Sequence, residues 1–142
     1  MRSTYRVLAM LIAIGVVLQA AFIAWGLFAV VHNTDDGEVF DKNTETAGFG
    51  IHALFGDAII PLLALLLLII SFFARVPGGV KWAAITFGVT VLQVVLAFAG
   101  RALPLIGLLH GINAFALATV ASIAMRKVRQ APAAEPVAPV GA

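Results

Sequence analysis

The sequence contains no cysteine, and only 11% of its 142 residues are charged. The absence of cysteine excludes disulfides, thiolate metal sites and cysteine nucleophiles. A charged fraction this low, beside 62% hydrophobic residues, lies far outside the usual range of a soluble globular domain. The net charge of +2 comes from residues at the ends of apolar runs rather than from a basic patch, so nucleic acid is not an expected partner. Composition therefore indicates one compact helical unit in a lipid bilayer.

Four apolar runs each approach the ~20 residues that cross ~30 Å of hydrocarbon as a helix. They cover residues 7–31, 51–74, 80–100 and 105–125. Open sheet edges are not satisfied in lipid, so the runs are predicted to be helices. The first run is about twice as long as the apolar core of a signal peptide, which indicates a retained helix. We therefore predict an all-α, four-helix transmembrane bundle over residues 1–126 and a disordered cytoplasmic tail over 127–142.

The charged residues are divided unequally between the two sets of helix ends. Seven of the nine basic residues lie at one set: Arg2, Arg6, Arg75, Lys81, Arg126, Lys127 and Arg129. The other set carries Lys42, Arg101 and the acids Asp35, Asp36, Glu38, Asp41 and Glu45. The positive-inside rule then predicts cytoplasmic N- and C-termini for a multi-pass protein of the cell membrane, in a bacterium the plasma membrane. The acidic 32–50 loop would lie outside, where a cationic protein partner is one candidate ligand.

Small and polar residues recur along one side of several predicted helices. The stripes are Gly15, Gln19 and Gly26; Thr86, Thr90, Gln93, Ala97 and Gly100; and Gly107, His110, Gly111, Ala114, Ala118 and Ala121. Such stripes let helix backbones approach closely and form hydrogen bonds between helices. They favour ordinary bundle packing and, as one candidate function, a cofactor-free accessory or structural subunit that binds a partner protein. No internal repeat is evident in the sequence.

Two of the three histidines are predicted to lie at matching depth near the outer face. His52 opens the second run and His110 lies about five residues into the fourth, so their depths differ by only ~5 Å at 1.5 Å per residue. Gly56 follows His52 by one turn, and Gly107 and Gly111 flank His110. A porphyrin held between helices needs two imidazoles at one height with little bulk beside them. The alternative is interfacial histidines bonded to loops or water, which is the interpretation we give to His32.

Asp57 is the only acid inside a predicted span. It is offset from His52 by about 140° around a regular helix, so the two are not expected to share a face. Asn113 lies at similar depth and is a candidate partner for an interhelical bond. Pro61 removes the hydrogen bond to the Asp57 carbonyl and is expected to bend the helix. We expect Asp57 to be structural, and a small transporter or proton-conducting protein is the alternative that it suggests.

A resemblance to a known family rests on two short stretches. The first is Gln93-Val-Val-Leu96, followed by the turn at Pro104 and by Leu109-His110 and Ala114. The second is Ile51-His52-Ala53-Leu54. Both resemble ligand helices of the heme A synthase family, whose members contain two four-helix halves. Residues 7–126 are similar to one such half, the heme b-binding half, and also to four-helix bacterial membrane families of similar layout.

This resemblance implies that His52 and His110 are the two axial ligands of a b-type heme, with Gln93 as a packing residue nearby. Arg101, in the turn above, is placed either to meet a heme propionate or to anchor the helix at the interface. The family's catalytic Glu-x-x-His-Arg pattern is absent, because Phe49 and Ala53 stand at the acid and arginine positions. The sequence thus predicts a membrane heme b protein for electron transfer or heme handling at the outer leaflet, without support for hydroxylation.

Overall fold

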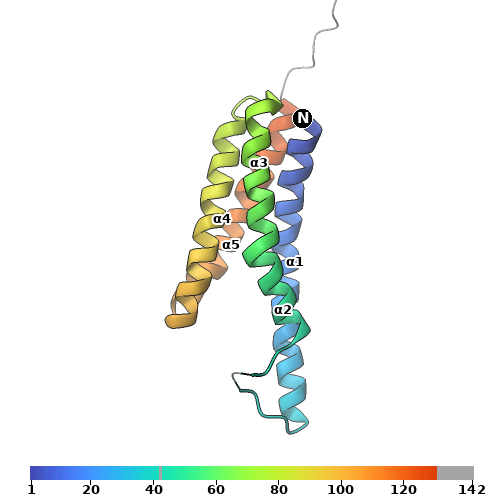
Figure 1. The fold of residues 1–142 in the computed structure, drawn as a ribbon, viewed down its shortest axis with the longest axis vertical. Helices are drawn as coiled ribbons and strands as arrows, with labels where there is room; N and C mark the ends of the chain where they lie inside the picture. Colours follow the sequence, from blue (N-terminus) through green and yellow to red (C-terminus); the bar gives the residue numbers. More distant parts are fainter. Residues whose placement is uncertain (42, 131–142) are drawn as a thin grey trace, which may run out of the picture.

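The computed structural model describes residues 1–41 and 43–130, and within them it contains helices and no strands. Helix α1 (Arg2–Asp35) is followed by a continuous rod of α2 (Ala47–Leu54), the π-turn η1 (Phe55–Ile59) and α3 (Ile60–Ala74). Helices α4 (Gly79–Ala102) and α5 (Ile106–Lys127) complete the bundle, and a 3₁₀ turn η2 (Val128–Gln130) ends it (Figure 1). Four helical segments are long and apolar enough to cross a membrane. The predicted four-helix transmembrane bundle is confirmed.

Each helix extends beyond the apolar run that predicted it. The run marks the part suited to hydrocarbon, whereas backbone hydrogen bonding continues into the polar ends of a helix. At the C-terminal end α5 and η2 continue through Gln130, so the expected start of a disordered tail at 127 is wrong for residues 127–130. The rest of that predicted tail, 131–142, lies outside the described residues.

The helices run alternately up and down, and α1, α3, α4 and α5 form a ring of neighbours in that order (Figure 1). The ring is tied together at its basic ends. There the buried Tyr5 hydroxyl donates to the Gly79 carbonyl at 2.9 Å and joins α1 to the start of α4. The tight α3–α4 turn places both Arg75 (φ 50°) and Gly78 (φ 69°) in the left-handed region, the second being a conformation that glycine adopts without strain.

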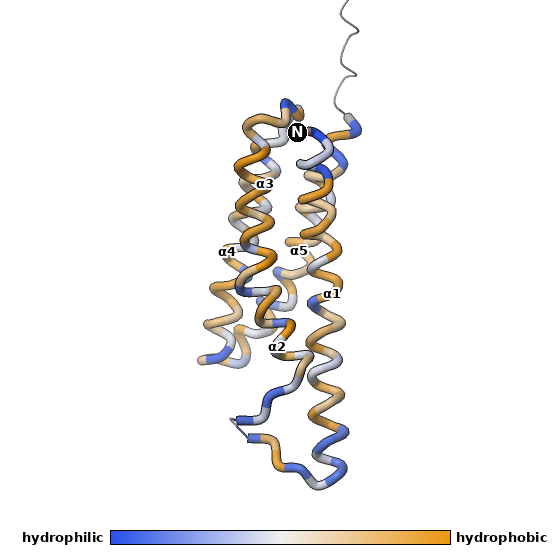
Figure 2. The backbone as a smooth tube through the Cα atoms, turned by 45° about the vertical axis from the view of Figure 1, so that its right-hand side comes forward, coloured by the Kyte–Doolittle hydropathy of each residue, from blue (hydrophilic) through white to orange (hydrophobic). Residues whose placement is uncertain are grey.

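The bundle is solid at its basic end and divided at the other. Large side chains less than 2% exposed, among them Ile12, Leu67 and Leu117, fill the space between helices in the solid part. Toward the acidic loop, the α1–α2 pair separates from the α4–α5 pair (Figures 1 and 2). Apolar residues also cover the outside of the helices, as expected for a surface that faces lipid rather than water (Figure 2).

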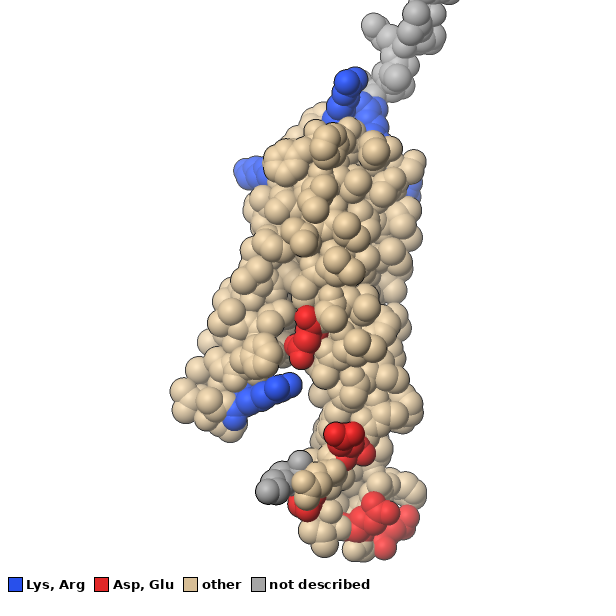
Figure 3. Space-filling model, viewed as in Figure 1, with Lys and Arg blue, Asp and Glu red and all other residues tan. Residues whose placement is uncertain are grey.

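Unequal helix lengths carry the acidic loop away from the bundle. The 34 residues of α1 span about 51 Å at 1.5 Å per residue, well beyond ~30 Å of hydrocarbon. Acidic side chains gather around this extension, whereas basic side chains gather at the opposite end of the molecule (Figure 3). The contact between α1 and α2 is close because glycines meet there: a Cβ on Gly48 would clash with the backbone of Gly26.

The second spanning segment contains a π-turn where the sequence predicted a bend. Pro61 has no N–H, and in a regular helix its ring would clash with the Asp57 carbonyl. The π-turn relieves this conflict by adding a residue to the turn, so that the Ile60 N–H donates to the Phe55 carbonyl five residues earlier. The extra residue also changes which side chains face the bundle interior beyond His52.

Candidate functional site

A cavity of about 770 Å³ lies between the two separated helix pairs. Residues from α1, the α2–η1 segment, α4 and α5 line it, and most of them are apolar. All seven cofactor-binding residues predicted from the sequence lie in this lining: His52, Gly56, Gln93, Arg101, Gly107, His110 and Gly111. His32 lies elsewhere, at the end of α1, with its ring 76% exposed and 3.6 Å from Asp36. The structure therefore brings two histidines together and leaves the third at the surface, as expected.

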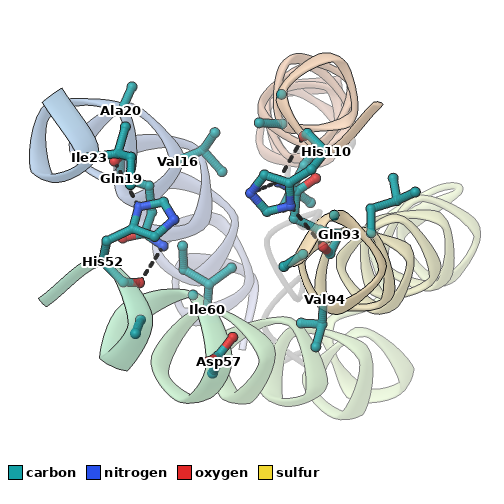
Figure 4. Close-up of a pocket in the computed structure, with 18 of the residues that line it drawn as sticks. Val16, Gln19, Ala20, Ile23, His52, Asp57, Ile60, Gln93, Val94 and His110 are labelled. Atoms are coloured by element: carbon teal, nitrogen blue, oxygen red, sulfur yellow. Dashed lines mark hydrogen bonds between the residues drawn. The ribbon is translucent and has the colours of Figure 1, made fainter. Parts of the chain in front are cut away.

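The rings of His52 and His110 face each other across the cavity from opposite helix pairs (Figure 4). Their centres are 6.4 Å apart and their planes make an angle of 63°. This separation and angle are those of an edge-to-face pair of aromatic rings.

His52 is fixed by a reciprocal pair of hydrogen bonds with Gln19 of α1 (Figure 4). The His52 Nδ1 lies 3.0 Å from the Gln19 carbonyl oxygen, and the Gln19 amide Nε2 donates to the His52 carbonyl at 2.9 Å. A carbonyl only accepts, so Nδ1 carries the proton and Nε2 keeps its lone pair. Within the described part of the chain His52 Nε2 makes no hydrogen bond, and the ring lies at the cavity.

His110 is held in the same manner by Gln93 of α4. Its Nδ1 lies 3.0 Å from the Gln93 carbonyl oxygen, and the Gln93 amide donates to the His110 carbonyl at 3.1 Å. The same amide also lies 3.2 Å from His110 Nε2. Gln93 is therefore more than the packing residue expected, because it fixes both the orientation and the tautomer of the ring.

Each histidine helix is thus preceded in the chain by a glutamine helix that holds it. The glutamines end identical tripeptides, Val17-Leu18-Gln19 and Val91-Leu92-Gln93. The expectation of no internal repeat is wrong in this respect, since both helix pairs carry the same reciprocal pair of bonds between a glutamine and a histidine. Sequence reasoning placed Gln19 in a packing stripe and missed its role, although this short repeat was a signal that could have revealed it.

The glycines around the site play different parts. A Cβ added to Gly107 or Gly111 would meet nothing within 4 Å, so both leave open space in the cavity beside His110. A Cβ on Gly56 would instead lie 2.7 Å from the Gln19 amide nitrogen. Gly56 therefore makes room for the amide that holds His52, rather than leaving empty space beside the ring.

Asp57 and Arg101 are the charged residues of the cavity lining. Asp57 lies on the π-turn and lines the same cavity as His52, which differs from the separate faces expected of a regular helix. Its carboxylate makes no hydrogen bond or ion pair within residues 1–41 and 43–130. Asn113, the candidate partner, bonds elsewhere: its Nδ2 donates to Gln93 Oε1 at 2.7 Å and to the Val89 carbonyl at 3.1 Å. Arg101 lies over the ring of Phe98 at the C-terminal end of α4.

Among the described residues, no group of three or more histidine, cysteine or acidic side chains is placed to hold a metal ion. The arrangement is a pair of imidazole rings that come from opposite helix pairs and line one cavity. A pair of that kind suits a metal whose remaining ligands come from a macrocycle.

Comparison with known proteins adds one finding. Residues 39–103 match a family of unknown function (DUF6220), a segment that includes His52, Gln93 and Arg101 and stops before His110. No curated protein and no solved structure matches the chain.

Proposed function

We propose that this protein is an integral membrane heme b-binding protein that serves electron transfer or heme handling. The observation that carries the proposal is the pair of imidazoles facing each other across an apolar cavity, with ring centres 6.4 Å apart. When bound, the heme supplies one-electron redox chemistry. His52 and His110 would hold the iron, and the protein would set their orientation and the apolar surroundings that tune the potential.

The spacing of the rings fits a single iron between them. Two ligand nitrogens about 2 Å from a metal, each about 1.1 Å from its ring centre, would place those centres roughly 6.2 Å apart if both rings were in line with the metal. The 63° angle between the ring planes is compatible with this, because rotation about the nitrogen–iron direction changes only that angle. Both Nδ1 atoms donate to carbonyls, the usual second bond of a ligating histidine, so each lone pair lies on Nε2. The His52 lone pair has no hydrogen-bond partner among the described residues, whereas the His110 lone pair accepts from the Gln93 amide and would have to be released before it binds a metal.

The cavity also fits the body of a porphyrin. Its volume of about 770 Å³ lies within the ~300–1,000 Å³ of typical cofactor sites. Gly107 and Gly111 provide space beside one ligand, and Arg101 offers a guanidinium for a propionate. The resemblance of residues 7–126 to one half of a heme A synthase supports the same ligand pair. Phe49 stands where that family has its catalytic acid, so we propose electron transfer or heme handling rather than hydroxylation.

We further propose that the basic ends of the helices face the cytoplasm of a bacterial cell, with both termini on that side. Arg2 and Arg6 begin α1, Lys81 lies in the first turn of α4, and Arg126 lies in the last turn of α5. The cavity would then open toward the outer leaflet, and the acidic loop would lie where an extracytoplasmic partner protein can reach it.

The test is an absorption spectrum of protein purified after growth with ample heme, oxidised and then dithionite-reduced. We expect a low-spin, six-coordinate spectrum for the wild type. His52→Ala and His110→Ala should each abolish it, whereas the surface variant His32→Ala should leave it unchanged. A wild type without a Soret band would refute heme binding, and the cofactor-free accessory subunit would then be the better interpretation.

A further inference from the structure

We propose that the two histidines are unequal ligands: His52 is the stronger, and the Gln93 amide weakens coordination by His110. This inference rests on the proposed heme function and goes beyond it. It starts from one difference between the two halves of the site. His110 Nε2 has the Gln93 amide nitrogen 3.2 Å away, whereas His52 Nε2 has no hydrogen-bond partner in the described part of the chain.

The direction of every bond around His110 is fixed by its neighbours. Asn113 Nδ2 lies against the Val89 carbonyl, which only accepts, so Asn113 also presents a donor to Gln93 and meets its Oε1. The other end of the Gln93 amide is then the NH₂ group, which donates to the His110 carbonyl. Since Nδ1 of His110 is protonated, its Nε2 accepts the second amide hydrogen. The lone pair with which His110 would bind a metal is therefore already engaged in a hydrogen bond, and we call such a lone pair capped.

The half of the site around His52 lacks this cap. Gln19 Nε2 donates to the His52 carbonyl, but no bond joins it to the His52 ring nitrogen Nε2. Asn113, three residues after His110, has as its counterpart Phe55, three residues after His52. A phenyl ring cannot donate, and Gln19 Oε1 is accordingly buried without a partner among the described residues. The difference between Asn113 and Phe55 at matching positions thus explains why Gln93 is anchored and bonds to a histidine ring nitrogen Nε2, whereas Gln19 does not.

Gln93 must release Nε2 before His110 binds a metal, because one lone pair cannot serve both. The release costs one hydrogen bond while the bonds to the His110 carbonyl and to Asn113 can remain. A net hydrogen bond of this kind changes an affinity by about 3- to 10-fold. His52 has no such cost, so it is the stronger single ligand, and Gln93 is a positioning residue that weakens the second.

The experiment measures hemin affinity and spin state in single-histidine proteins. His110→Ala keeps only the open ligand, and His52→Ala keeps only the capped one. We expect His52→Ala to bind hemin about 3- to 10-fold more weakly than His110→Ala. Adding Gln93→Leu to His52→Ala should restore most of that affinity, because leucine is close in size and donates no hydrogen bond.

The matched control is Gln19→Leu added to His110→Ala. It removes the same kind of amide-to-carbonyl bond between helices. It should not raise the hemin affinity, because His52 Nε2 has no hydrogen bond from Gln19 that could be released. Equal affinities of the two single-histidine proteins, or a gain from Gln19→Leu as large as that from Gln93→Leu, would overturn the inference while leaving the heme assignment intact. Absence of hemin binding in the wild type would overturn the heme assignment itself, and the inference with it.

Discussion

Gly111→Leu tests whether the space beside His110 is the space that a porphyrin occupies. A Cβ at Gly111 meets nothing within 4 Å, and the residue lines the cavity, so the leucine side chain projects into open volume. The fold should tolerate it, since replacing a glycine inside a helix adds about 0.5–1 kcal/mol of stability. A rigid ring system that must share the space with four added carbons loses about 1–3 kcal/mol, the usual cost of overpacking.

That cost predicts a hemin affinity about 5- to 150-fold weaker than in the wild type. The control is Gly88→Leu, because Gly88 is also an exposed glycine inside a helix with nothing within 4 Å of its Cβ, but it does not line the cavity. Hemin titration in detergent, with circular dichroism to check the fold, compares the two variants directly. Equal hemin affinities would refute the position assigned to the porphyrin.

Three further predictions follow from other parts of the molecule. Reporter fusions at Asp41 and at the C-terminal tail should report opposite sides of the membrane, and a common side would contradict the four-span bundle. Asp57→Asn should keep the fold and the heme content, because the carboxylate bonds to nothing among the described residues; loss of electron transfer with both intact would instead favour a proton path. The Asn43 backbone N–H holds the pKa of Asp41 below that of an ordinary aspartate, so the hydrogen bond from Asn43 to the Asp41 carboxylate should be intact at neutral pH and weaken only as the pH falls through that lowered pKa. An NMR acid titration of the Asn43 amide measures this, and a midpoint at the ordinary aspartate value would contradict it.

The parts of the site that follow from helix geometry alone could be predicted from the sequence. The helical rise is constant, so counting residues from each polar boundary placed His52 and His110 at one depth. The number of apolar runs likewise predicted the number of membrane-spanning helices, because a constant rise sets how many residues a span needs. The glycines beside His110 were also identified correctly as open space, since a residue without a side chain leaves room whichever neighbours surround it.

The parts that depend on register between helices could not be predicted. Gln19 reaches His52 because Gly26 and Gly48 let α1 and α2 pack closely, and this register appears only in three dimensions. The π-turn before Pro61 changed the angular position of Asp57, which a regular 100° per residue had placed on another face. Asn113 bonds to Gln93 instead of Asp57, because a polar group finds the partner that its neighbouring helix presents.

The solid half of the bundle has an electrical consequence. Ile12, Leu67 and Leu117 close the space between the helices on the basic side of the cavity, each less than 2% exposed. A membrane potential falls mainly across the part of a protein that excludes water and ions, where 100 mV does about 2.3 kcal/mol of work on each charge. In the proposed electron-transfer function, an electron that reached the cavity from its open end would cross little of this barrier. Its transfer would then be nearly independent of the membrane voltage.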